Sequence, residues 1–284
     1  MPSFWDKFSR AMKTFVRLCF LLLLSSDALH AAEPLRFSMV VLENKEAVIR
    51  EFSPMLERIT SRIGQPVSYV FHDNYEAILD AFARREVDLA YLGPLPYVRL
   101  RERNADVELM VRFKEADGSE RYRCVIAAFR GDSIRLAGLK NKTVGLTQAL
   151  STCGPLSVNG LLRKYAGFGL NQTRQQMLGS HEKVALAIIS GEVAAGGLKE
   201  AIASKYAGLG LDVLARTEPL PGFALVANRA SLNDADIAHL REILLQTPAT
   251  EYQRWGESLR HGMQPALDHE YDAVRALVSQ KKAP

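Results

Sequence analysis

The stretch KTVGLTQALSTCGPLSVNGLLRKYA, residues 142–166, joins a strand, a polar loop and a helix, and this order decides the predicted fold class. The opening KTVGL predicts a short strand, and apolar residues then recur at helical spacing. The residues of that helical face are Val158, Leu161, Leu162 and Tyr165. A strand that leads directly into a helix is the unit from which α/β sheets are built, so the stretch predicts an α/β protein.

The same alternation of strands and helices extends in both directions along the chain. The predicted strands are residues 35–41, 67–71, 87–92, 108–113, 122–129, 142–146, 175–178, 192–197, 212–215 and 223–227. One helix is expected to begin at Ser53-Pro54, and helical patterns end the chain at 234–246, 249–258 and 268–279. This alternation predicts βαβ units and mostly parallel sheets flanked by helices.

The strand and helix pattern occurs twice, with no long linker, tandem repeat or low-complexity tract between the two halves. It therefore favours two α/β lobes joined by crossing strands, which we expect at 122–129 and 223–229. On this division, the first lobe consists of residues 32–127 and 224–284, and the second lobe consists of residues 128–223.

The first thirty-one residues differ from the rest of the chain. Lys13 and Arg17 lead into the apolar run LCFLLLL, and small residues follow as far as Ala32. This order is typical of a secretory signal peptide, and the apolar run is too short to span a bilayer. Residues 1–31 are therefore predicted to be a cleaved leader, with Met1 or Met12 as the start, and the remaining chain is predicted to be periplasmic.

The composition and charge of the chain argue against a nucleic-acid-binding function. The chain has 48% hydrophobic and 24% charged residues, as globular proteins do, and its net charge of +4 falls close to zero without the basic leader. A nucleic-acid partner would require a concentrated basic face, so none is expected. Outside the leader the chain has two cysteines, Cys124 and Cys153, and both a disulfide and two separate thiols remain open.

Polar loops follow four of the predicted strands. They are His72–Tyr75, Tyr91–Pro94, Ser151–Gly154 and Gly179–His181. In open α/β sheets, ligands bind beyond the carboxyl ends of the strands, so these loops are the candidate site. Ser151 and Thr152 precede a helix, where their hydroxyls either cap the helix or donate to an oxyanion.

Some of the same residues are also compatible with an enzymatic function, and this alternative remains open. Cys153 as nucleophile and His181 as base would form a hydrolytic dyad. However, the sequence offers no third residue to orient the histidine, and it contains no metal-ligand spacing, Walker loop or GxSxG motif. We therefore expect no catalytic residue, no metal and no cofactor.

Several segments in the same order resemble the phosphonate, phosphite and phosphate-binding proteins of ABC importers, over about residues 35–280. The matching segments are Asn74-Tyr75, DLAYLGPLPYV at 88–98, Tyr122, Ser151-Thr152-Cys153-Gly154, Gly179-Ser180-His181 with the following VALAII, and the Pro-rich 218–222. The resemblance implies a type II periplasmic-binding fold, with a ligand cleft between two lobes that close over the ligand by a hinge motion.

The resemblance also implies a set of ligand-binding residues. A tetrahedral phosphorus oxyanion would be held by the Ser-Thr run, the helix N-terminus and the histidine, and two tyrosines of the other lobe would close over it. The residues carried over are Ser151, Thr152, Cys153, His181, Tyr75 and Tyr122, and the secondary candidates are Tyr91, Gly93, Gly154 and Lys199.

Two departures from the family pattern bear on the ligand. Cys153 stands where the family has a third hydroxyl, and a thiol is a weaker hydrogen-bond donor. The positions at which aminophosphonate-binding relatives carry acidic residues fall at about Ala201 and Phe223, with Glu200 as a substitute if the spacing slips by one residue. Lys199 would further disfavour an amine.

The sequence thus predicts a monomeric periplasmic solute-binding protein that delivers phosphite, phosphate or a small alkylphosphonate without an amine to an ABC permease. One alternative is an extracytoplasmic oxyanion sensor that partners a membrane histidine kinase. A further alternative is the Cys-His hydrolase.

Overall fold

The computed structural model describes residues 33–41 and 44–282, and the predicted leader at 1–31 lies outside them. The chain divides into two units, Met1–Glu33 and Pro34–Pro284, and the second unit contains the fold described below. No helix in the described ranges is both long enough and apolar enough to cross a membrane.

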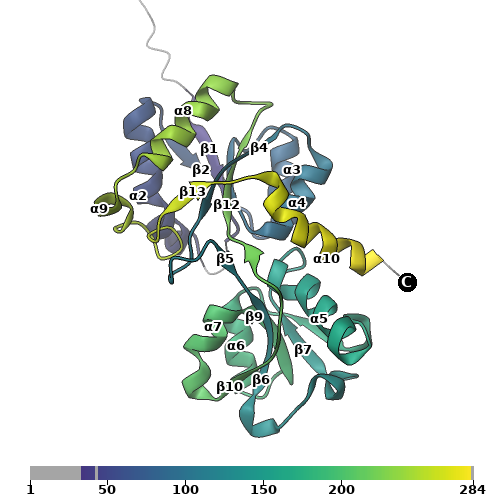
Figure 1. Ribbon diagram of the computed structural model, residues 1–284. Helices are drawn as coiled ribbons and strands as arrows, with labels where there is room; N and C mark the ends of the chain where they lie inside the picture. Colours follow the sequence, from purple (N-terminus) through teal and green to yellow (C-terminus); the bar gives the residue numbers. More distant parts are fainter. Residues whose placement is uncertain (1–32, 42–43, 283–284) are drawn as a thin grey trace, which may run out of the picture. The chain divides into compact units, whose positions relative to one another are not determined.

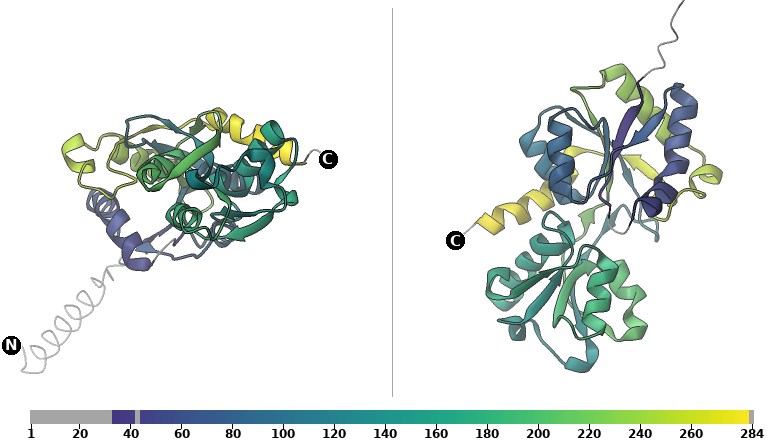
Figure 2. Two further views of the ribbon diagram at one scale, coloured as in Figure 1. Left: turned by 90° about the horizontal axis from the view of Figure 1, so that it is seen from below. Right: turned by 180° about the vertical axis from the view of Figure 1, so that it is seen from behind.

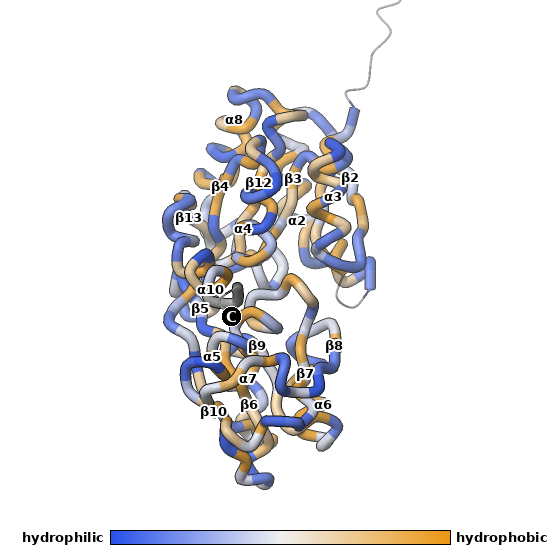
Figure 3. Tube along the Cα trace, turned by 90° about the vertical axis from the view of Figure 1, so that its right-hand side faces the viewer, coloured by the Kyte–Doolittle hydropathy of each residue, from blue (hydrophilic) through white to orange (hydrophobic). Residues whose placement is uncertain are grey.

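The first sheet has six strands, which come from the two ends of the chain (Figure 1). In spatial order they are β13 (Met263–Pro265), β4 (Val107–Phe113), β12 (Ala224–Asn228), β3 (Leu89–Leu92), β1 (Leu35–Ser38) and β2 (Val67–Tyr69). Every residue of β3 and β12 is buried, and Figure 3 shows the apolar character of these central strands. Continuous apolar strands of this kind need helices on both faces of the sheet.

Helices supply that cover. The helices α2 (Lys45–Ile63) and α8 (Asp234–Leu245) lie on one face, and α3 (Tyr75–Ala83) and α4 (Pro94–Arg103) lie on the other (Figures 1 and 2). A short helix α9 (Ala249–Tyr252) follows α8. The last helix, α10 (Asp272–Lys282), packs against α4 and against a helix of the second sheet, so it links the two halves of the unit.

The second sheet has five strands, all from the middle of the chain. In spatial order they are β10 (Leu211–Arg216), β6 (Cys124–Phe129), β9 (Ala195–Lys199), β7 (Thr143–Leu146) and β8 (Arg174–Met177). Its helices are α5 (Ser157–Ala166), α6 (His181–Ile189) and α7 (Glu200–Lys205). The predicted division into lobes at 127/128 and 223/224 remains a prediction. The strands of the second sheet lie between Cys124 and Arg216, so β6 begins before the predicted boundary at 127/128.

Two segments connect the sheets, and their short strands β5 (Arg121–Tyr122) and β11 (Leu220–Pro221) pair with each other. The described strands of the first sheet form two parallel and three antiparallel pairs. Those of the second sheet form two of each. The α/β class is confirmed, but the sheets are mixed rather than mostly parallel because β6 and β12, which enter from the other half, run antiparallel to their neighbours.

The predicted start of the first helix at Ser53-Pro54 is wrong. The helix α2 begins at Lys45, where the side chain of Asn44 caps it by accepting a hydrogen bond of 2.8 Å from the Ala47 amide. Pro54 lies inside the helix. The sequence did not predict α4, whose first residue is Pro94. The helix predicted at 249–258 is too long, because α9 ends at Tyr252.

Candidate functional site

A cavity of about 540 Å³ lies at the ends of the strands, and loops of both sheets line it. Nine of the ten residues predicted for the site contribute to its wall. They are Tyr75, Tyr91, Gly93, Tyr122, Ser151, Thr152, Cys153, His181 and Lys199. Gly154 is not among the described residues that line the cavity. It is instead buried beside Thr147, whose hydroxyl would lie 2.7 Å from a Cβ at this position.

The Ser151 loop does not enter an α-helix directly. Residues Thr152–Leu156 form a π-helical turn, and α5 begins at Ser157. Ser151 precedes this turn, but its side chain makes no capping hydrogen bond within the described part of the chain. The interpretation of Ser151 as a simple helix cap is therefore wrong, and the Ser151 hydroxyl is available at the cavity wall.

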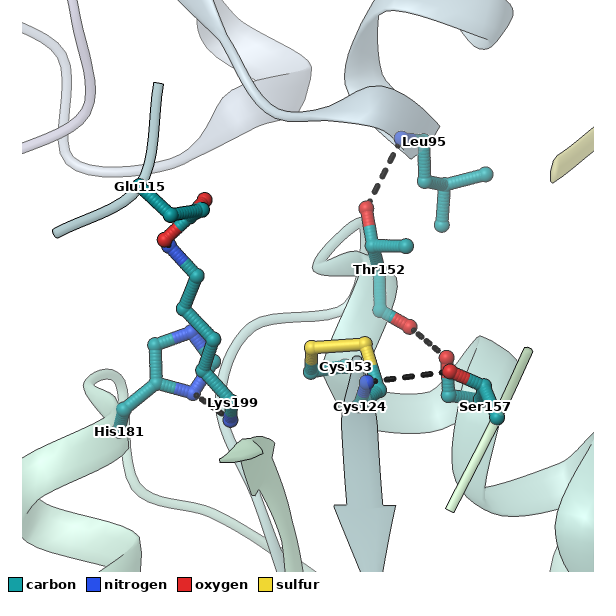
Figure 4. Close-up of a disulfide and its surroundings, with 9 residues drawn as sticks. Leu95, Glu115, Cys124, Thr152, Cys153, Ser157, His181 and Lys199 are labelled. Atoms are coloured by element: carbon teal, nitrogen blue, oxygen red, sulfur yellow. Dashed lines mark hydrogen bonds and ion pairs between the residues drawn. A yellow bond between two sulfur atoms is a disulfide. The ribbon is translucent and has the colours of Figure 1, made fainter. Parts of the chain in front are cut away.

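Thr152 does act as a cap, but for a helix of the other sheet. Its Oγ1 accepts a hydrogen bond of 2.9 Å from the backbone N–H of Leu95, in the first turn of α4 (Figure 4). Since this contact uses a lone pair of the oxygen, the hydroxyl proton of Thr152 remains able to donate. Thr152 thus joins the two halves of the site, and its hydroxyl also contacts that of Tyr122 across the cavity wall.

Cys153 forms a disulfide with Cys124 at the start of β6, across a sequence separation of 29 residues (Figure 4). Both cysteines are almost fully buried. The interpretation of Cys153 as a thiol donor to the ligand is therefore wrong, because its sulfur is bonded to another sulfur. The same bond removes the free thiolate that the Cys-His hydrolase requires.

His181 is the first residue of α6, and Ser180 rather than His181 caps this helix by accepting a hydrogen bond of 3.2 Å from the Lys183 amide. The Nδ1 atom of His181 accepts a hydrogen bond of 3.3 Å from the backbone N–H of Lys199. Burial of the ring, with the neighbouring Lys199 charge, lowers the pKa of His181 to about 4. At neutral pH the imidazole is therefore neutral, and its proton is on Nε2 as a donor.

This low pKa predicts a pH dependence of stability. In the unfolded chain the His181 side chain takes up a proton near pH 6.5, whereas in the folded protein it does so only at about pH 4. The free energy of unfolding therefore has its full value above pH 6.5. It decreases as the pH falls from 6.5 to about 4, and the total decrease due to His181 is at most about 3 kcal/mol. Urea unfolding of the ligand-free protein at several pH values measures this loss. The variant His181→Gln should show a shallower decline, and equal slopes for both proteins would contradict the assignment.

Three tyrosines complete the wall on the side of the first sheet. Tyr75 is the first residue of α3, which covers the first sheet, and Tyr122 lies in β5, a strand of one of the connecting segments. Burial raises the pKa of each hydroxyl well above its usual range, which keeps both as neutral donors. Tyr91 has a ring stacked on Phe223, with centroids 5.2 Å apart, and it belongs both to the apolar core and to the cavity wall.

Several polar residues that line the cavity were not predicted from the sequence, and three of them bear on the ligand. Thr147 Oγ1 and Gln148 Oε1 are buried, and neither finds a hydrogen-bond partner within the described ranges. Buried polar atoms of proteins are nearly always paired, so these two point to a partner from outside the chain, such as a ligand or water. The third residue, Glu115, pairs with Lys199. Thr147 directly follows the strand that precedes the Ser151 loop and could have been found there, but Glu115 has no sequence signal, because it follows a strand that is distant along the chain.

The described residues contain no group of three histidine, cysteine, aspartate or glutamate side chains placed to hold a metal ion. Glu200, considered as a partner for an amine, forms an ion pair with Arg216 at 2.9 Å and does not belong to the described cavity wall. Ala201 and Phe223 do line the cavity, and neither carries a charge. The cavity wall also carries charged side chains, namely Glu51, Lys114, Glu115, Glu182, Lys199 and Glu257. The neutral donors that suit an oxyanion are the hydroxyls of Ser151 and Thr152 and the Nε2–H of His181.

Two mixed sheets, joined by crossing segments and with a cavity that loops of both sheets line, are the arrangement typical of periplasmic substrate-binding proteins. The family model described as "ABC transporter, phosphonate, periplasmic substrate-binding protein" matches residues 37–271, and the chain belongs to this family. Membership in this family places the protein in the periplasm.

Individual relatives are distant. The chain is 25% identical over 175 residues to the phosphate-import protein PhnD of Mycolicibacterium smegmatis, an alignment that covers 58% of this chain and 54% of that protein. It is 24% identical over 172 residues to the phosphonates-binding periplasmic protein of Escherichia coli, covering 58% and 51%. The chain thus spans about half the length of the curated relatives it matches.

A solved structure confirms the fold. PhnD1 from Prochlorococcus marinus in complex with methylphosphonate superposes with a TM-score of 0.73, at 15% identity, over 88% of this chain and 98% of that one. At this identity, the likeness concerns the fold alone.

Proposed function

We propose that the protein is the substrate-binding component of an ABC importer and that its cavity holds one small phosphorus oxyanion. The observation that carries this proposal is the convergence of neutral donors on one cavity: the hydroxyls of Ser151 and Thr152 and the Nε2–H of His181. Family membership and the methylphosphonate named for the Prochlorococcus relative support a ligand such as phosphite, phosphate or a small alkylphosphonate.

The binding mechanism follows from these donors. An oxyanion on the Ser151 loop accepts hydrogen bonds from the two hydroxyls, and His181 adds a third donor without bringing a charge. Tyr75 and Tyr122 donate from the other side, so that closure of the two halves surrounds the anion. A permease of the membrane then receives the ligand from the closed protein, which acts as a monomer and performs no chemical step.

A thermal-shift screen tests this function. Because a ligand that binds only the folded state raises Tm, phosphite, phosphate and methylphosphonate should raise it by several degrees at millimolar concentration. Sulfate and methanesulfonate, which are similar in shape, are the matched controls and should have a smaller effect. A rise in Tm with sulfur oxyanions but with none of the phosphorus oxyanions would contradict the proposal.

Thr147 is proposed as an additional donor, in place of the hydroxyl that Cys153 lacks. Its buried Oγ1 lines the cavity without a partner in the described chain, and Gly154 leaves the space that this hydroxyl occupies. The variant Thr147→Val keeps the shape of the side chain, and we expect it to weaken oxyanion binding about tenfold, the value of one hydrogen bond to a charged group. Calorimetric titration measures the loss. The variant Thr147→Ser keeps the hydroxyl and should bind within about threefold of the wild type, whereas equal Kd values for all three proteins would exclude this role.

A further inference from the structure

The cavity contains an ion pair that joins its two sides. The Nζ atom of Lys199, at the end of β9, lies 2.6 Å from Oε2 of Glu115, which follows β4 of the other sheet (Figure 4). Only 19% and 17% of the two side chains are exposed, so this pair differs from the solvated ion pairs of the surface. Glu115 and Lys199 both line the cavity.

Two aromatic rings complete the surroundings of the Lys199 ammonium. Its Nζ lies 4.7 Å from the ring centroid of Tyr122 and 5.6 Å from that of Phe223. Both distances are within the range of cation–π attraction, about 6 Å. A carboxylate with aromatic faces around it is the arrangement by which proteins recognise alkylammonium ligands. Here the alkylammonium in that position is the side chain of Lys199.

We propose that Glu115, Tyr122 and Phe223 form an ammonium-binding cage that the chain fills with its own Lys199, and that this tethered ammonium excludes aminoalkylphosphonates. The inference rests on the proposed function, because it concerns the ligand of the same cavity. A ligand amine would have to displace Lys199 from Glu115, and the displaced ammonium would remain in the cavity without its carboxylate.

The cage lies directly beside the oxyanion donors. The backbone N–H of Lys199 donates to His181 Nδ1, so the residue that fills the cage also orients the proposed anion donor. Tyr122 belongs both to the cage and to the proposed anion site. An aminoalkylphosphonate with its oxyanion on His181 would therefore direct its amine towards an occupied position, whereas an alkylphosphonate without an amine would meet no such conflict.

Removal of the Lys199 side chain tests the cage without any phosphorus ligand. The variant Lys199→Ala should vacate the cage, and ethylammonium chloride should then raise its Tm more than sodium chloride does at equal concentration. Lys199→Met is the matched control, because it fills a similar volume without a charge, and ethylammonium should have no specific effect on it or on the wild type. Glu115→Gln in the K199A background should abolish the effect, since it removes the carboxylate and leaves both rings.

Ethylphosphonate and 2-aminoethylphosphonate, which differ only in the amine, test the consequence for the ligand. In calorimetric titrations the wild type should prefer ethylphosphonate, and K199A should shift the ratio of the two Kd values at least tenfold towards the amine, while K199M should not. An unchanged ratio in K199A, or ethylammonium effects equal in K199A and K199M, would overturn the cage. If no phosphonate binds to any of the proteins, the proposed function is wrong. The ethylammonium measurement then still shows whether Glu115, Tyr122 and Phe223 form an ammonium-binding cage.

Discussion

Replacement of Ser151 and Thr152 together by alanine is expected to weaken phosphorus-oxyanion binding at least a hundredfold. Each hydroxyl lies at the cavity wall and is able to donate to the ligand, because Ser151 makes no capping bond in the described chain and Thr152 uses only a lone pair for Leu95. A hydrogen bond to a charged group contributes about 1.5–3 kcal/mol, and two of them correspond to a hundredfold or more in Kd. Calorimetric titration with methylphosphonate measures the change.

The single variant Ser151→Ala separates ligand binding from folding. Thr152→Ala leaves the Leu95 amide without its partner and so affects stability as well, whereas Ser151→Ala removes no capping hydrogen bond. Thr152→Ser keeps both functions of the hydroxyl and should bind within a few-fold of the wild type. A double alanine variant that folds and binds methylphosphonate within threefold of the wild type would show that the ligand does not lie on this loop.

Removal of the disulfide by Cys124→Ala with Cys153→Ala is expected to lower the free energy of unfolding by about 3–4 kcal/mol. The disulfide closes a loop with a sequence separation of 29 residues, and its loss gives conformational freedom back to the unfolded chain. Both cysteines are buried in the apolar cluster beside the cavity, so part of the loss also comes from packing. Urea unfolding of the oxidised wild type and the double variant measures the difference.

The wild type unfolded in the presence of a reductant is the control, because it removes the disulfide and keeps both sulfur atoms. Its stability should fall towards that of the double variant. Equal stabilities with and without reductant, together with an intact mass that indicates two free thiols, would show that the disulfide does not form. The oxyanion donors should survive its loss, since the sulfur of Cys153 donates no hydrogen bond in the disulfide.

Much of the fold follows from local sequence patterns. The strand at 143–146 and the helix α5 were predictable, because their apolar spacing acts over a few residues, whereas the π-helical turn between them was not predicted. The mixed direction of the sheets was not predictable in this way, because it depends on β6 and β12 entering from the other half of the chain.

The first helix shows where local signals mislead. Ser53-Pro54 has the composition of a helix start, but Val48 and Phe52 are buried on the same side as Met55 and extend the helix towards its N-terminus. Burial of an apolar face outweighs the hydrogen bond that a proline removes, so Pro54 is retained inside the helix.

The part of the candidate site that lies in loops directly after strands could be predicted from the sequence. The contacts between residues that are distant in the sequence could not. Ser151, Thr152 and His181 follow strands of one sheet and therefore come together in the cavity wall. The Cys124–Cys153 bond and the Glu115–Lys199 pair join segments that are far apart in sequence, and their formation depends on the tertiary fold. The departure from the family pattern at Cys153, and the position of Lys199 in the cavity, thus depend on partners that no local pattern reveals.

A calorimetric titration of the wild type with methylphosphonate, in parallel with sulfate, tests the central claim most directly. We expect a single site per chain with a Kd in the micromolar range or below for methylphosphonate or for one of its close relatives, phosphite and phosphate. Sulfate should bind at least tenfold more weakly. The absence of binding heat for all three phosphorus oxyanions, at temperatures where binding enthalpy is measurable, would contradict it.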